Sequence, residues 1–167
     1  PFLWMSLMEY QKERIYTFMS PEADALGSGW NIAQSKIAIG SGQFFGKGYM
    51  EGSQSQLDFI PESHTDFIFA VIVEEFGFLG ALGLFLLYAF LIHRLLYVAK
   101  SSNSKFAKLV SATLSIILAA YITLNISMVV GIFPVVGMPL PFISQGGTAL
   151  VVNMITIGII LSLRRTT

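Results

Sequence analysis

The sequence predicts an all-α integral membrane protein, a polytopic helical bundle, and three observations lead to that class. First, 54% of the 167 residues are hydrophobic and only 12% are charged, about half of the roughly 25% found in a typical soluble domain. Second, residues 109–163 contain no charged residue. Third, apolar stretches of about 20 residues recur, and a helix of that length crosses ~30 Å of hydrocarbon.

Three segments are long and apolar enough for a complete membrane span, namely 67–92, 106–130 and 146–163. Residues 1–8 read as the end of a preceding span, because the chain starts inside an apolar run and without a methionine. We therefore expect the C-terminal part of a larger protein. Cysteine is absent, so no loop is held by a disulfide.

The basic residues predict which loops are cytoplasmic. They gather around the loop 93–105 and in the tail 164–167, at Arg94, Lys100, Lys105, Lys108, Arg164 and Arg165. Loops rich in lysine and arginine stay on the cytoplasmic side, so the segments 9–66 and 131–145 should face outward. The first of these carries eight acidic and four basic residues, and the second carries no charge.

The outer segment 9–66 is expected to be a folded cap, because structureless loops of this length are uncommon. Its centre, 39–48, is rich in glycine and contains Lys47. Glycines free backbone N–H groups for a phosphate, although no Gly-Lys-Ser/Thr motif is present. A tight turn between short helices is the simpler interpretation, and both remain open at this point.

The outer loop 131–145 is apolar yet interrupted by Pro134, Pro139 and Pro141. Prolines at these positions forbid a regular helix. Irregular backbone at membrane depth is tolerated only when it is buried in protein or lines a cavity. We therefore expect a re-entrant-like element that packs against the bundle and could close a site opposite Asp66.

Asp66 is the last charged residue before the first span, in the acidic run 61–69. Ionisable groups at a membrane edge are functional candidates. Ser63 and Asp66 also fit a capping box, with Ser63 as N-cap and Asp66 as third helical residue. The spacing alone is equally consistent with Asp66 as a helix-capping residue and as a catalytic residue, and one residue can have both roles. His64 could orient the carboxylate or be a solvated loop residue.

Glu74 and Glu75 lie inside the first span, where carboxylates are costly. Glu74 would lie about 80° from Asp66 in helical projection, so the two carboxylates could border one cleft. Alternatively, one glutamate only pairs with Arg14 or Lys36 from the cap. 

Other small and polar residues of the spans favour packing. Gly77, Gly80 and Gly83 share a helix surface that would let another helix approach closely. Asn125 and Ser127 could form hydrogen bonds between helices. Neither set predicts chemistry by itself.

Several blocks of the chain resemble the SEDS family of RodA, FtsW and SpoVE proteins. The blocks are PESHTDFIF (61–69), EEFGFLG (74–80), QSKIAIGSG (34–42) and GMPLPFISQGGT (137–148). They occur in the family's order over nearly the whole chain, and 46–48 with 54–60 are most similar to the RodA branch. The resemblance implies a ten-span fold, of which this chain would be roughly the last four, with a large structured extracytoplasmic loop.

The resemblance also implies a function in the bacterial inner membrane. Family members are peptidoglycan glycosyltransferases that polymerise lipid II during cell elongation and rod-shape maintenance, beside a class B penicillin-binding protein; no nucleic acid is involved. The resemblance further implies that Asp66 is the general base, or the ligand of a divalent cation such as Mg²⁺ or Mn²⁺. Supporting or substrate-binding roles are expected for Glu74, His64, Lys36, Lys47, Arg14 and Ser144.

Two alternatives remain, a lipid II flippase and a noncatalytic scaffold of the elongation machinery. A flippase needs polar groups through the membrane, and 109–163 offers only Ser, Thr, Asn, Gln and one Tyr. This composition favours chemistry at the outer surface. The chain of 167 residues by itself is expected to be inactive.

Overall fold

The computed structural model describes residues 8–20, 27–57, 59–60 and 62–165. No strand occurs in these residues, so the predicted all-α class is confirmed. The predicted end of a preceding span, 1–8, lies outside the described residues except for Met8. The helices are α2 (Glu9–Met19), α3 (Ser28–Gly42), α4 (Ser53–Gln56), α5 (Ile68–Ser101), α6 (Lys105–Val130) and α7 (Gly147–Arg165).

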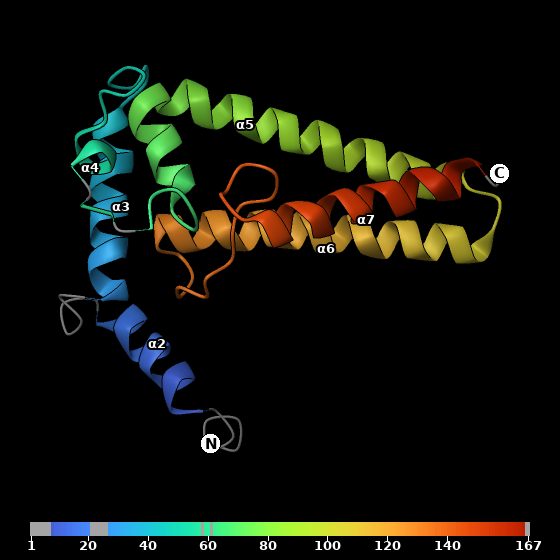
Figure 1. Ribbon diagram of the computed structural model, residues 1–167, viewed down its shortest axis with the longest axis horizontal. Helices are drawn as coiled ribbons and strands as arrows, with labels where there is room; N and C mark the ends of the chain where they lie inside the picture. Colours follow the sequence, from blue (N-terminus) through green and yellow to red (C-terminus); the bar gives the residue numbers. More distant parts are fainter. Residues whose placement is uncertain (1–7, 21–26, 58, 61, 166–167) are drawn as a thin grey trace.

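The helices form two arms that meet at one corner of the molecule. In Figure 1, α6, α7 and the longer part of α5 run lengthwise beside one another, while α2 and α3 descend across one end. The first turns of α5 lie beside α3, and the rest of α5 then bends away to follow α6. The corner therefore brings α3 and the residues that follow it into contact with α5 and α6.

Two helices, α5 and α6, are long and apolar enough to cross a membrane. Only 22% and 39% of their most apolar stretches are buried, whereas the core helix of a soluble protein would be mostly buried. Their length, composition and exposure are those expected of helices that cross a membrane. α5 continues past the expected end at 92 as far as Ser101, because Leu95, Val98 and Ala99 still pack on one buried face.

The best-buried side chains gather where α3, α5, α6 and the loop 131–146 meet. Ala38, Phe67, Ala70, Met128, Val129 and Leu140 are at most 1% exposed. The hydroxyl of Ser35 on α3 adds a polar tie, since it donates to the carbonyl oxygen of Val129 at 2.8 Å. This core fixes α3 against the C-terminal end of α6, beside Phe67 of the turn that carries Asp66.

The bend of α5 occurs at Gly77, whose φ of 65° and ψ of −159° are non-helical. Such a break frees backbone groups that a continuous helix would pair. The segment 43–48 pairs them instead. The carbonyls of Glu74 and Glu75 accept from the N–H groups of Lys47 and Gly48, both at 3.0 Å. Beyond the bend, the N–H groups of Phe78 and Leu79 donate to the carbonyls of Gln43 and Phe44.

Glycines make this exchange possible because the two backbones touch. A Cβ at Gly42 would lie 2.0 Å from the Val73 oxygen, and a Cβ at Gly46 would lie 2.1 Å from the Glu75 oxygen. The N–H groups of 46–48 are already bonded within the protein. The phosphate-loop interpretation of 39–48 is therefore wrong. The tight-turn interpretation is confirmed for 43–48, whereas 39–42 form the last turn of α3.

Within the described residues, only one of the three glycines expected to pack against another helix makes a close approach. A Cβ at Gly77 would meet the nitrogen of Gly46 at 2.3 Å, but one at Gly80 would meet Phe76 of its own helix. At Gly83 a Cβ would meet nothing within 4 Å in the described part of the chain. The close partner of Gly77 is the segment 43–48 and not another helix.

Gly77→Ala should lower the free energy of unfolding by at least about 1–3 kcal/mol, because only glycine adopts this backbone conformation without strain. Gly83→Ala, in the same helix, is the matched control and should be neutral or stabilising by up to about 1 kcal/mol. Thermal unfolding of both variants in detergent measures the difference. Equal stabilities would contradict the role of Gly77.

Candidate functional site

Asp66 lies in a turn that precedes α5. The N-cap of α5 is Phe67, its first helical residue is Ile68, and no side chain caps it. The predicted capping box of Ser63 and Asp66 is therefore wrong. The physical reason is a series of tight turns, in which the N–H of Ser63 donates to the carbonyl of Ile60 and the N–H of Phe67 to that of Glu62. Asp66 thus remains outside the helix.

Three consecutive carbonyls of this turn, those of residues 64–66, each accept a hydrogen bond from a residue that is distant in the sequence. The side chain of Asn125 on α6 donates to the Asp66 carbonyl at 2.9 Å. The same amide nitrogen donates to the carbonyl of Met138. Asn125 is 0% exposed, and its partners lie in a turn and a loop, whereas a hydrogen bond to another helix was predicted for this residue.

The loop 131–146 supplies the other two donors. The hydroxyl of Ser144 donates to the carbonyl of Thr65 at 2.6 Å and accepts from the N–H of Leu140 at 2.6 Å. The N–H of Gln145 donates to the carbonyl of His64 at 2.9 Å. The apolar loop thus packs against the Asp66 turn, as expected from its prolines. The hydroxyl of Ser144 therefore contacts backbone groups of the turn and of its own loop.

The electrostatic surroundings raise the pKa of Asp66 above its ordinary value. Burial is the largest cause, followed by the charge of the Glu62 carboxylate and a hydrogen bond with it, and the Arg14 guanidinium acts in the opposite direction. A raised pKa makes a carboxylate a better proton acceptor near neutral pH. Glu62 was not among the predicted site residues, although its spacing of four from Asp66 in one acidic run was a visible signal.

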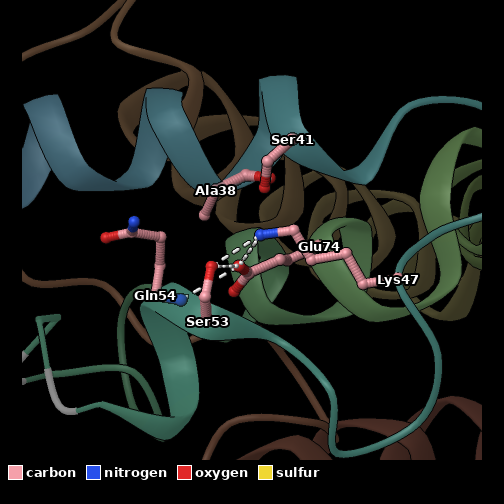
Figure 2. A network of polar contacts seen from close by, with 6 residues as sticks. All are labelled: Ala38, Ser41, Lys47, Ser53, Gln54 and Glu74. Carbon is pink, nitrogen blue, oxygen red and sulfur yellow. Dashed lines mark hydrogen bonds and ion pairs between the residues drawn. The ribbon is translucent and has the colours of Figure 1, made fainter.

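Glu74 belongs to a separate, buried network, which Figure 2 shows between α5, the segment after α3 and α4. Its carboxylate is 0% exposed and pairs with the ammonium of Lys47 at 2.7 Å. It also accepts from the hydroxyl of Ser53 and the N–H of Gln54. A buried carboxylate needs such donors to offset desolvation. 

This network corrects two expectations. Because Glu74 is completely buried, it does not border an open cleft with Asp66; its position fits support of the bend in α5. Lys47 is bonded to Glu74 and Ser53, so its ammonium is not available to a phosphate. 

Lys36 and His64 are both exposed and take different positions. Lys36 lies against Gly131, the C-cap of α6, since a Cβ there would come within 2.7 Å of the ammonium nitrogen. A cation at a helix C-terminus is favourable. The His64 carbonyl, rather than a ring contact, ties this residue to the loop 131–146.

A largely apolar cavity of about 570 Å³ opens between α6, α7 and the loop 131–146. Its walls include Tyr121, Gly137, Met138 and Asn153. A Cβ on Gly137 would lie 3.5 Å from an oxygen of the Asp66 carboxylate, so Asp66 lies beside the cavity wall. The volume lies in the range of small-molecule sites, about 300–1,000 Å³. The sequence predicted that the loop 131–145 would be buried in protein or line a cavity, but it did not predict a cavity between α6 and α7.

The carboxylates near Asp66 suit one type of metal ion. The described residues contain no group of three or more histidine, cysteine, aspartate or glutamate side chains that could hold a metal. Asp66 and Glu62 form a pair of carboxylates, and Mg²⁺ is often bound by one or two carboxylates together with substrate phosphates. The donor set therefore fits a cation shared with a phosphorylated substrate rather than a closed protein site.

The whole chain, residues 1–167, matches the family model of the FtsW, RodA and SpoVE cell cycle proteins. It is 51% identical over 164 residues to the peptidoglycan glycosyltransferase MrdB of Escherichia coli K12, covering 98% of this chain and 44% of that protein. It is 39% identical to the peptidoglycan glycosyltransferase RodA of Treponema pallidum, covering 94% and 36%.

Two solved structures are similar to the fold. A peptidoglycan synthase complex, studied for the coordination of polymerization and crosslinking, superposes with a TM-score of 0.77 at 30% identity, covering 98% of this chain and 44% of that chain. RodA of Thermus thermophilus gives 0.59 at 33% identity, covering 62% and 35%. The chain spans less than half the length of these relatives. It belongs to the FtsW, RodA and SpoVE family of cell cycle proteins, the SEDS family.

Proposed function

We propose that the protein carrying this chain is a peptidoglycan glycosyltransferase that polymerises lipid II, with Asp66 as its general base. The curated relatives carry that activity in their names. The observation that supports the role of Asp66 is its position. Its carboxylate lies beside an apolar cavity, its pKa is raised, and its backbone is held by α6.

The proposed step is a displacement at a sugar carbon. The 4-hydroxyl of the acceptor N-acetylglucosamine attacks C1 of the donor N-acetylmuramic acid, while the C1–O bond to pyrophosphate breaks. The hydroxyl proton passes to the Asp66 carboxylate, and undecaprenyl pyrophosphate leaves with the bonding electron pair. A base must first be held within reach of the proton and then tuned in pKa; the hydrogen bonds to 64–66 hold it and Glu62 tunes it.

The departing pyrophosphate needs positive charge nearby. Arg14 is exposed and its charge acts on Asp66, so it is the predicted cation best placed for this role. Lys36 remains a candidate from its exposed position beside α6, while Lys47 is excluded by its ion pair. In the alternative role of Asp66 as a metal ligand, Asp66 and Glu62 would hold Mg²⁺ or Mn²⁺, which would supply charge neutralisation at the leaving group.

The membrane arrangement belongs to the same proposal. The segment 9–66 and the loop 131–145 lie outside the inner membrane, and the basic loop and tail lie inside, in a multi-pass protein of ten spans. The cavity takes the apolar part of the lipid substrate, because its walls are largely apolar. The partner is a class B penicillin-binding protein, a transpeptidase, consistent with the similarity to a synthase complex.

Asp66→Asn tests the assignment in the purified full-length protein with its transpeptidase partner and lipid II. Loss of a general base is expected to slow glycan synthesis by roughly 10²–10⁴-fold. Glu51→Gln is the matched control, because it neutralises an exposed carboxylate of the same outer segment and should leave the rate unchanged. Glycan strands made by Asp66→Asn at the wild-type rate would overturn the proposal.

Changes at Glu62 and Arg14 should move the pH dependence of turnover in opposite directions. A general base works deprotonated, so the rate rises with pH through the pKa of Asp66. Glu62→Gln removes a negative charge that raises this pKa, so the acidic limb should move to lower pH. Arg14→Gln removes the opposing positive charge, so the limb should move to higher pH.

The measurement is the rate of lipid II polymerisation between acidic and neutral pH for each variant. Glu51→Gln again serves as the control and should reproduce the wild-type profile. Shifts of the same sign for Glu62→Gln and Arg14→Gln would contradict this electrostatic description of Asp66.

A further inference from the structure

Asn125 is a completely buried amide in the apolar helix α6. Both of its described hydrogen bonds come from one nitrogen, which donates to the carbonyls of Asp66 and Met138. These two residues lie 59 and 13 positions away in the chain. One side chain therefore joins α6, the Asp66 turn and the wall of the cavity, because Met138 lines that cavity.

The Asp66 carbonyl needs an external donor because α5 does not supply one. The first bond of α5 runs from the N–H of Ala70 to the carbonyl of Phe67, three residues back. The Asp66 carbonyl precedes this turn. A part-buried carbonyl left without a partner is unfavourable, and the Asn125 amide supplies that partner at 2.9 Å and fixes the direction of the carbonyl.

In the described part of the chain, the side-chain amide of Asn125 forms its hydrogen bonds through its nitrogen and not through its oxygen. Within the described residues, the side-chain oxygen of Asn125 is buried without a hydrogen-bond partner. An apolar residue of the same shape would avoid this unfavourable burial. It would also leave two carbonyls without their donor. The amide thus serves as a double donor, and its two acceptors are the backbone of Asp66 and the cavity wall.

We infer that Asn125 is a positioning residue for the proposed glycosyl transfer, holding the Asp66 carboxylate at a fixed place relative to the cavity. This inference rests on the proposed function. Asn125 does not touch the reacting atoms; it acts through the backbone of Asp66. A base displaced by about 1 Å can lose roughly 10²-fold in rate, so loss of the donor should reduce turnover while substrate binding is largely kept.

Asn125→Leu is the decisive variant, because leucine has nearly the shape of asparagine, suits a membrane helix and donates no hydrogen bond. In the full-length protein with its partner and lipid II, kcat should fall roughly tenfold to a hundredfold with KM nearly unchanged. Ser111→Ala is the matched control, since Ser111 is also 0% exposed on α6 and its hydroxyl has no partner among the described residues. It should retain the wild-type kcat.

A double-mutant cycle with Asp66→Asn separates positioning from general support of the fold. If Asn125 acts through Asp66, Asn125→Leu should cause no further loss in the Asp66→Asn background. A wild-type kcat for Asn125→Leu, or an equal loss in both backgrounds, would overturn the inference. If Asn125→Leu does not fold, Asn125→Ala takes its place. Failure of both to fold beside a folded Ser111→Ala would also overturn it, since the amide would then serve the fold.

The outcome for Asp66 alone distinguishes this inference from the proposed function. Asp66→Asn at the wild-type rate would overturn the proposed function itself. An inactive Asp66→Asn together with a fully active Asn125→Leu would overturn only the positioning role of Asn125.

Discussion

The structure depends most on the three hydrogen bonds that hold the carbonyls of residues 64–66. Their donors are Gln145, Ser144 and Asn125, which come from the loop 131–146 and from α6. These bonds join the turn that carries Asp66 to α6 and to the loop 131–146, and the burial of Phe67 in the core holds the same turn. With them, the carboxylate has a defined position between the start of α5 and the cavity, and a base must be positioned before its pKa matters.

The bend at Gly77 makes this arrangement compatible with a membrane helix. The first turns of α5 lie beside α3, while the remainder follows α6 (Figure 1). The backbone groups freed at the bend are paired by the segment 43–48, and the buried pair of Glu74 and Lys47 joins the same two segments (Figure 2). The polar residues of the first span therefore stabilise the corner that presents Asp66.

The sequence predicted the features that depend on composition and local pattern. The helical class, the apolar stretches of α5 and α6 and the packing of the proline-containing loop all follow from hydrophobicity and backbone chemistry. The wrong predictions concern contacts between distant segments. The predicted capping box is wrong because the turns at 60–67 place Asp66 before the helix. The predicted cleft with Glu74 is wrong because that carboxylate is buried and paired with Lys47. The effect of Glu62 on Asp66 and the position of the cavity between α6 and α7 depend on the folded arrangement.

Asp66→Glu would test most directly whether the position of the carboxylate, and not its charge alone, determines activity. Glutamate keeps the negative charge but moves it by one methylene group from the held backbone. In lipid II polymerisation by the full-length protein and its partner, kcat should fall at least about tenfold, as expected for a base displaced by about 1 Å, with KM nearly unchanged. A wild-type kcat for Asp66→Glu would contradict the view that the clamped turn sets the chemistry.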